Sequence, residues 1–390
     1  MIDKAAGCRL RDGSDRRRDP GDERSDPGDD WAILAAGMTR VAALFVVLVA
    51  TACSRDRAEP RCTSLTHRLL VERRADYQRA LQRARGWLDA LTIDPAALRA
   101  AGLKGKKKLT EELDGYVRLW KVAGSEERKA ILERVRAVVR VTDDPSYHDL
   151  ASVSDDELRE DSTSYLRTAL LMDQLGLDTS RYREEIAKAK PRLDAHLQSR
   201  GAHQRLAFHW YYRHFNLAEP FPLGGALEDG LVARRPDPKS ITPRDAYRLT
   251  HEVFVPYEFG DQLDEVDPFD KDSKRYLAAV LALQSRRAME AGDADLLAEL
   301  LSCMRYLRQV EDPAYRDGLG FLLDHQHEDG SWGDVAEARR IFGEHAAEGR
   351  LLHSTTVAIE ALTVAFHPAW NRDLYPGCAD DQLAGGGSAK

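Results

Sequence analysis

Apolar residues recur every three or four positions along most of the chain after Thr63, which is the period of α-helices that face a core. Two of these stripes are Leu70, Tyr77, Leu81, Ala84, Leu88 and Ile131, Val135, Val138, Val139. No segment has the strict alternation of apolar and polar residues that is typical of a strand. The pattern predicts an all-α protein.

Capping residues mark where several of these helices begin. Ser154 followed by Glu157 is a capping box. Thr242-Pro243-Arg244-Asp245 combines a cap, a proline in the first turn and an acid at the third position, and Asp312-Pro313 repeats this logic. Glycines mark the helix ends, at Gly176, Gly201, Gly224, Gly225 and Gly292.

The predicted helices alternate in character. Residues 182–199 are charged on most faces, whereas residues 203–217 are aromatic and apolar with few polar positions. A helix that is apolar nearly all round must be covered on both sides. The alternation therefore predicts a layered repeat of outer and inner helices.

The segment from Met38 to Cys53 has a short positive start, an apolar stretch and small residues before Cys53. This layout is typical of a secretory signal, and Ala50-Thr51-Ala52-Cys53 resembles a bacterial lipobox. The resemblance implies a lipidated Cys53 and a protein of the cell envelope that is membrane-anchored and faces the periplasm or the exterior.

The 37 residues before Met38 are rich in Asp, Arg, Gly and Pro, so we expect a disordered leader and a true start at Met38. The alternative is a genuine extension with a transmembrane anchor, although residues 41–52 fall short of the roughly 20 apolar residues that a span needs. The expected organisation is leader 1–37, signal peptide 38–52, linker 53–64, helical domain 65–376 and disordered tail 377–390.

One motif points to a fold family. Gln326, Gly330 and Trp332 form Gln-x-x-x-Gly-x-Trp, which resembles the QW motif of terpenoid cyclases and prenyltransferase-like toroids. Asp329-Gly330 predicts a tight turn with positive φ, which Gln326 would bind and Trp332 would cover. The resemblance implies an α/α toroid of paired inner and outer helices around a central cavity, with the helix over 352–366 returning inside. A chance turn between two unrelated helices remains the alternative.

Three cysteines follow Cys53. Cys303 lies in an apolar helical context and is expected to be a small core residue. Cys62 and Cys378 lie in polar surroundings near opposite ends of the domain, and an exported protein permits disulfides. Because the toroid brings both ends of the domain together, we predict a Cys62–Cys378 bridge, although sequence alone leaves connectivity open.

The toroid resemblance implies a site in the central cavity, so the candidates are polar residues on apolar inner helices. His251 and His353 are candidate catalytic acid/base groups, or metal ligands together with Asp261. The alternative is that each histidine is structural and hydrogen-bonded within the core. The sequence identifies no cofactor, and no particular metal.

Five further residues are candidate ligand-binding groups. Tyr165 and Tyr257 are expected on the cavity wall, and Thr355 follows His353 in a His-x-Thr-Thr segment. His209 and Arg213 share a helical face, where they would suit an anionic or polar ligand. Polar tips on an aromatic core would explain the last two equally well.

The diagnostic motifs of known toroid enzymes are absent from the sequence. The Asp-x-Asp-Asp acid of class II cyclases is reduced to Asp155-Asp156, which capping explains, and Cys303 lacks the Asp-x-Cys context of a prenyltransferase zinc site. The basic run at 104–108 is expected to be a solvated tip, with contact to anionic lipid headgroups as the alternative.

The net charge of −8 gives no electrostatic footprint for nucleic acid. Taken together, the lipobox and QW resemblances imply an exported, lipid-anchored toroid with an enzymatic cavity. The expected reaction is of lyase, hydrolase or cyclase type, on a small molecule, a glycan, a peptide or an isoprenoid. The alternative is a non-catalytic envelope lipoprotein that binds a ligand or partner through the toroid. Convergence of His251, His353 and an acidic side chain on one pocket would favour the enzyme.

Overall fold

The computed structural model describes residues 62–378 except 93, 95, 97–99, 101, 221–222, 262–266, 344–349, 372–373 and 376. The chain divides into two units, residues 1–58 and 59–390, and every described residue lies in the second. The expectations about the leader, Met38, the signal peptide and Cys53 therefore lie outside the described residues. Over the described ranges the secondary structure is helical without a strand, so the all-α prediction is confirmed.

The longer helices are α2 (Leu65–Glu72), α3 (Arg74–Ala90), α5 (Gly102–Val122), α6 (Ser125–Val138), α7 (Asp155–Gln174), α8 (Ser180–Leu197), α9 (Ala202–His214), α12 (Pro243–Phe254), α13 (Lys271–Ala291), α14 (Ala294–Tyr306), α15 (Pro313–Asp324), α16 (Val335–Phe342) and α17 (Leu352–Phe366). The short elements are α10 (Leu223–Glu228), α11 (Leu231–Arg234), η1 (Val139–Asp143), η2 (Pro145–Tyr147), η3 (Pro238–Ser240), η4 (Val255–Gly260) and η7 (Pro368–Trp370).

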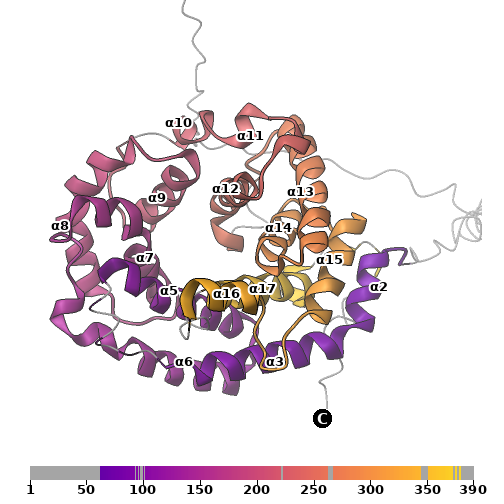
Figure 1. The fold of residues 1–390 in the computed structure, drawn as a ribbon, viewed down its shortest axis with the longest axis horizontal. Helices are drawn as coiled ribbons and strands as arrows, with labels where there is room; N and C mark the ends of the chain where they lie inside the picture. Colours follow the sequence, from indigo (N-terminus) through magenta and orange to yellow (C-terminus); the bar gives the residue numbers. More distant parts are fainter. Residues whose placement is uncertain are drawn as a thin grey trace, which may run out of the picture. The chain divides into compact units, whose positions relative to one another are not determined.

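Six of the described helices pack in a closed cycle. Helix α5 contacts α7, which contacts α9, and the series continues through α12, α14 and α17 until α17 contacts α5 again. Figure 1 shows these helices lying inside α3, α6, α8 and α13. The outer helices cover them in turn, since α6 packs on α5, α8 on α7, α11 on α12 and α13 on α14.

The inner helices have the apolar character that burial on all sides demands. Every residue of α14 is buried. In α17 every residue is buried except His353 and Val357, which face the cavity described below. The outer helices α3, α6 and α8 bury one stripe each, as the amphipathic pattern predicts.

The three predicted helix starts are confirmed at the atomic level, whereas Gly224 and Gly225 lie within α10 and do not end a helix. The Ser154 side chain accepts a hydrogen bond from the Glu157 amide, and Thr242 accepts one from the Asp245 amide. Asp312 accepts from the Ala314 amide, with Pro313 in the first turn of α15. These caps satisfy backbone donors that the first helical turn leaves unpaired.

The Gln-x-x-x-Gly-x-Trp segment follows α15 and contacts α3. Gln326 donates hydrogen bonds of 2.9 Å to the carbonyls of Gly330 and Ala80. Gly330 has φ of +100°, as predicted, and a Cβ there would lie 2.3 Å from the Arg83 carbonyl oxygen. The turn therefore needs glycine both for its conformation and for its contact with α3.

We expect Gly330→Ala to destabilise the protein by more than about 1 kcal/mol, because backbone strain and a clash with α3 act together. Chemical denaturation measures the loss. Gly320 is the matched control, because it lies within α15 with no atom within 4 Å of a built Cβ. Gly320→Ala should be neutral or stabilising by up to about 1 kcal/mol. Equal effects of the two substitutions would contradict the contact with α3.

Cys62 and Cys378 are joined by a disulfide, which is the pairing expected from the sequence, and their Cα atoms are 4.3 Å apart. The bond connects the first and last described residues across a sequence separation of 316. Cys303 is a free thiol with no exposure to solvent, as predicted for a core residue.

The basic run differs from its expectation. Lys106 is only 1% exposed, donates a hydrogen bond of 2.8 Å to the Tyr147 carbonyl and forms an ion pair with Asp149. The prediction of a solvated tip is therefore wrong for Lys106, because α5 extends through the run and turns this position inward.

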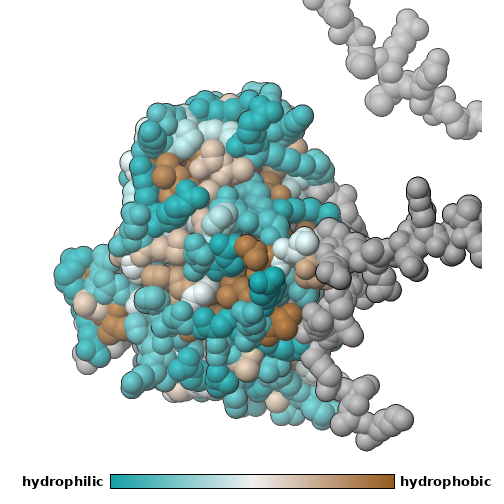
Figure 2. Space-filling view, turned by 90° about the vertical axis from the view of Figure 1, so that its right-hand side faces the viewer, coloured by the Kyte–Doolittle hydropathy of each residue, from teal (hydrophilic) through white to brown (hydrophobic). Residues whose placement is uncertain are grey.

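The surface is mostly polar on the face shown in Figure 2, where hydrophobic residues form small separate patches. Such scattered apolar exposure is normal for a folded domain. Among the described helices, none combines the length with the apolar content that a bilayer crossing requires.

Candidate functional site

All six helices of the inner cycle contribute to one cavity of about 360 Å³. Its lining includes a charged or titratable residue from each of them, namely Glu111, Arg167, His203, His251, Glu299 and His353. Ligand sites are usually concave and carry a few convergent polar groups. This cavity has more charged groups than a packed core tolerates without function or careful pairing.

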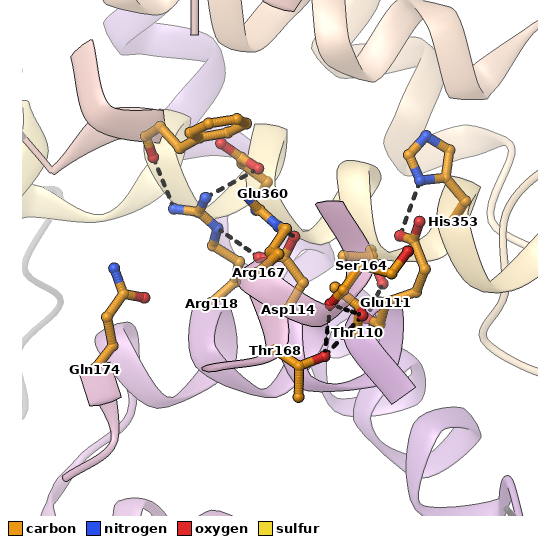
Figure 3. Close-up of polar contacts among 12 residues, drawn as sticks. Thr110, Glu111, Asp114, Arg118, Ser164, Arg167, Thr168, Gln174, His353 and Glu360 are labelled. Carbon is orange, nitrogen blue, oxygen red and sulfur yellow. Dashed lines mark hydrogen bonds and ion pairs between the residues drawn. The ribbon is translucent and has the colours of Figure 1, made fainter. Parts of the chain in front are cut away.

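His353 lies among three carboxylates. Its Nδ1 is 2.9 Å from Glu111 Oε2, a contact drawn in Figure 3. Its Nε2 is 3.3 Å from Glu299 Oε1 and 3.5 Å from Asp295 Oδ1. Burial alone would lower the pKa of His353, but Glu111 and Asp295 outweigh it and raise that pKa well above its usual value. These carboxylates therefore favour the protonated form of the ring.

The carboxylates around His353 differ from one another. Burial would raise the pKa of Glu111, but His353 outweighs it and lowers that pKa to about 2. Burial likewise opposes the lowered pKa of Glu299, to which His353 and His251 contribute. Burial dominates at Asp295 and raises its pKa. Asp295 Oδ1 is buried and has no hydrogen-bond partner among the described residues.

His251 and His203 form a second, neutral part of the site. Their ring centroids are 6.3 Å apart, and within the described part of the chain neither ring nitrogen has a hydrogen-bond partner. Burial lowers the pKa of His251, and burial together with His251 lowers the pKa of His203 to about 4. Both imidazoles are therefore neutral and present a free nitrogen to the cavity, where it can accept a proton.

A buried ion-pair network forms the opposite side of the cavity (Figure 3). Arg167 Nε donates a hydrogen bond of 2.9 Å to Asp114, and Arg118 lies 3.8 Å from the same carboxylate. Arg118 Nη2 is also 3.3 Å from Glu360 Oε2. The arrangement alternates charge signs, so each buried cation has an anion beside it.

Two residues beside this network have a left-handed backbone. Glu258 and Phe259 have φ of 48° and 53°, which costs free energy for residues with a Cβ. Arg118 Nη1 donates a hydrogen bond of 3.0 Å to the Phe259 carbonyl, and the Arg167 guanidinium lies 4.4 Å from the Phe259 ring centroid. Two cations therefore hold this segment of η4 against the cavity.

A second hollow of about 670 Å³ shares His203, Gln204, Tyr247 and His251 with the cavity. Five arginines line this space, which we call the arginine-lined hollow, namely Arg200, Arg205, Arg234, Arg244 and Arg248. The hollow opens to solvent, since Arg244 on its wall is exposed. Its acidic lining residues are Asp229 and Glu252, and Glu252 is engaged by the backbone amides of Leu231 and Val232.

Arg200 is the most buried of the five arginines, at 5% exposure. It donates hydrogen bonds to the Leu158 carbonyl and the Ser162 hydroxyl, while its Nε and Nη1 have no partner among the described residues. Burial lowers the pKa of Arg200 to about 10, which still leaves it charged at neutral pH. Arg205 and Arg248 are paired with Asp229 and Asp245, so the excess of positive charge beside the two histidines comes from Arg200, Arg234 and Arg244.

The structure brings together two of the three predicted catalytic residues. His251 and His353 both line the cavity. Asp261 does not reach it, because its carboxylate pairs with Lys121 and accepts a hydrogen bond of 2.8 Å from Gln174. The acidic partners of His353 are Glu111, Glu299 and Asp295 instead.

None of the five predicted ligand-binding residues lines the cavity. Tyr165 and Tyr257 are core residues, and Tyr165 is hydrogen-bonded to His148 at 2.6 Å. Thr355 accepts a hydrogen bond of 3.1 Å from the Trp332 amide. His209 is bound by Glu219, and Arg213 is exposed and 4.0 Å from Glu258. Four of the five are engaged in local contacts that residue type alone does not reveal, and Arg213 lies at the surface.

Sequence reasoning missed most of the charged lining. Asp295 and Glu299 are four residues apart in a helix that is apolar apart from them, Ser302 and Arg305, and Glu360 is the one acid within α17. Acids inside apolar helices are rare unless they are paired, so these positions carried a usable signal. Glu111 and Asp114 gave none, because α5 is polar on several faces.

Residues 110–362, more than half of the chain, match a family model described as a domain of unknown function, DUF6895. Comparison with curated proteins and with solved structures returned no match. The matched range contains every charged cavity residue named above, from Glu111 on α5 to Glu360 on α17. The chain therefore belongs to the DUF6895 family.

Proposed function

We propose that this protein is an enzyme whose central cavity performs acid/base chemistry on a small anionic substrate. The single observation that carries the proposal is the convergence of charged and titratable side chains from six helices on one cavity. Burying such groups is costly unless they are paired, and a stable core would be built more simply from apolar residues. Perturbed titratable groups in a cavity are typical of functional sites.

The chemistry of the lining favours particular roles. His251 has free ring nitrogens and a lowered pKa, so it suits a general base. The arginine-lined hollow leads to His251 and His203 and would attract and hold an anion such as a carboxylate or a phosphate ester. This combination favours lyase or hydrolase chemistry on an acidic sugar, an acidic peptide or a phosphate ester. An isoprenoid substrate would need a more apolar cavity.

We further propose that the helical unit is an (α/α)6 toroid and that the protein is an exported lipoprotein anchored through Cys53. The closed cycle of six inner helices and the Gln326–Trp332 turn support the first part. The signal-like segment before Cys53 and the Cys62–Cys378 disulfide support the second, since disulfides persist in oxidising compartments.

The test is a binding screen followed by a turnover assay. Thermal shift against oligouronides, acidic peptides and phosphate esters should yield an anionic ligand that stabilises the protein. His251→Ala should weaken that ligand at least tenfold and abolish its turnover while the protein stays folded. His209→Ala is the matched control, because His209 lies outside the cavity, and it should leave both unchanged.

Two outcomes would oppose this proposal. If no anionic ligand binds, or if His251→Ala binds it as the wild type does, the cavity is not the site. If a ligand binds in the cavity without any turnover, the protein is the non-catalytic envelope lipoprotein that forms the alternative.

A further inference from the structure

We propose that Asp295, Glu299 and His353 bind a divalent first-row metal ion at the edge of the cavity. The proposal goes beyond the acid/base function, which does not require a metal, and it concerns three residues of α14 and α17. Each offers one ligand atom, and the three atoms lie within 4.8 Å of one another.

The spacing of these atoms fits a shared ion. Ligands about 2.0–2.2 Å from one metal at tetrahedral or octahedral angles lie about 3.0–3.5 Å apart. His353 Nε2 is 3.3 Å from Glu299 Oε1 and 3.5 Å from Asp295 Oδ1. Both separations exceed the roughly 2.7–2.9 Å of a charge-assisted hydrogen bond. An ion here would take the place of the proton on Nε2.

The helices fix this arrangement. Asp295 and Glu299 are four residues apart on α14, so both carboxylates point from the same face. His353 lies at the start of α17, which packs against α14 along the inner cycle. Asp295 and Glu299 are 5% and 3% exposed, so the carboxylates cannot satisfy themselves with bulk water.

Asp295 gives a further indication that the site can take a cation. Its Oδ1 is buried and has no hydrogen-bond partner among the described residues, while Arg350 lies 3.7 Å from its other oxygen. An unsatisfied buried carboxylate oxygen costs free energy unless something binds it. A cation between Oδ1, Glu299 and His353 would remove that cost.

The surrounding contacts are those that orient metal ligands. Glu111 binds His353 Nδ1 at 2.9 Å, which turns Nε2 toward α14, as in carboxylate–histidine–metal arrangements. Thr250 donates a hydrogen bond of 2.6 Å to Glu299 Oε2, which leaves Oε1 facing His353. Two oxygens and one imidazole suit Mn²⁺ or Zn²⁺.

Such an ion would not be fully enclosed by protein. Glu299 and His353 line the cavity, so the remaining coordination positions face it. Three protein ligands with an open position are typical of catalytic rather than structural metal sites. An anionic substrate that enters through the arginine-lined hollow would meet the ion beside His251, because His251 lines both the hollow and the cavity.

The experiment uses the untagged full chain after treatment with a chelator. Binding of Mn²⁺ is measured by electron paramagnetic resonance, and binding of Zn²⁺ by titration calorimetry. We expect one ion per chain. Asp295→Asn should weaken the ion at least a hundredfold, and Glu111→Gln should weaken it about 10–100-fold through His353. Glu360→Gln is the control, because Glu360 lies on the same cavity but pairs with Arg118, and it should not change the affinity.

Absence of stoichiometric binding, or equal affinity in wild type and Asp295→Asn, would overturn the inference. Circular dichroism of each variant separates loss of binding from loss of folding. Binding of the anionic ligand found by thermal shift should also be measured in the presence of a chelator. If the anionic ligand binds but no metal does, the metal site is refuted and the proposed function stands. If a metal binds but no anionic ligand does, the metal site stands and the proposed function is refuted.

Discussion

The double variant Cys62→Ser/Cys378→Ser should be less stable than the oxidised wild type by on the order of 5 kcal/mol. The disulfide closes a loop between residues 316 positions apart, and the entropy that a cross-link removes from the unfolded chain grows with loop length. The value is an upper expectation, because measured gains are often smaller. Urea denaturation with and without reductant measures the difference.

The reductant supplies the control for this prediction. It should lower the unfolding midpoint of the wild type to that of the double variant, and it should not change the double variant. Cys303 is buried and remains a thiol in both states. Identical midpoints for oxidised and reduced wild type would contradict a stabilising role for the bond.

Trp332→Ala should cost about 3–5 kcal/mol. The side chain has no solvent exposure, and its indole donates a hydrogen bond of 2.8 Å to the Leu322 carbonyl. The substitution leaves both a cavity and an unpaired carbonyl at the end of α15. Thermal or urea unfolding with the disulfide intact measures the loss.

Trp120→Ala is the comparison for Trp332→Ala, because Trp120 is only partly buried and packs beside Arg128 at the surface. Its loss should be clearly smaller. Thr355→Val removes the acceptor of the Trp332 amide with little change in shape and should cost about 1 kcal/mol. If Trp332→Ala left the free energy of unfolding unchanged, the Gln326–Trp332 turn would not stabilise the fold as its contacts indicate.

The helical fold was predictable because its signals are local. The caps at Ser154 and Thr242 and the apolar run of 352–366 specify helix starts and helix character within a few residues. The positive φ of Gly330 was likewise readable from the Asp-Gly dipeptide. The packing of α17 against α5 was not readable in this way, because it depends on contacts between segments more than two hundred residues apart.

The site was predictable only in part. His251 and His353 stand out as polar residues on apolar segments, and both line the cavity. Their acidic partners could not be assigned, because Glu111 reaches His353 from 242 positions earlier in the chain. Asp261 was the wrong acid, since proximity in sequence to His251 says nothing about which way η4 turns after Phe254.

The disulfide between the first and last described residues also has a mechanical consequence. A pull applied to the chain before Cys62 and after Cys378 travels through the sulfur–sulfur bond and bypasses the helices between them. The inner cycle is therefore shielded from tension along the chain. Force would reach the cavity only after reduction, so the thiol–disulfide state of one bond decides whether the helical unit can be stretched open.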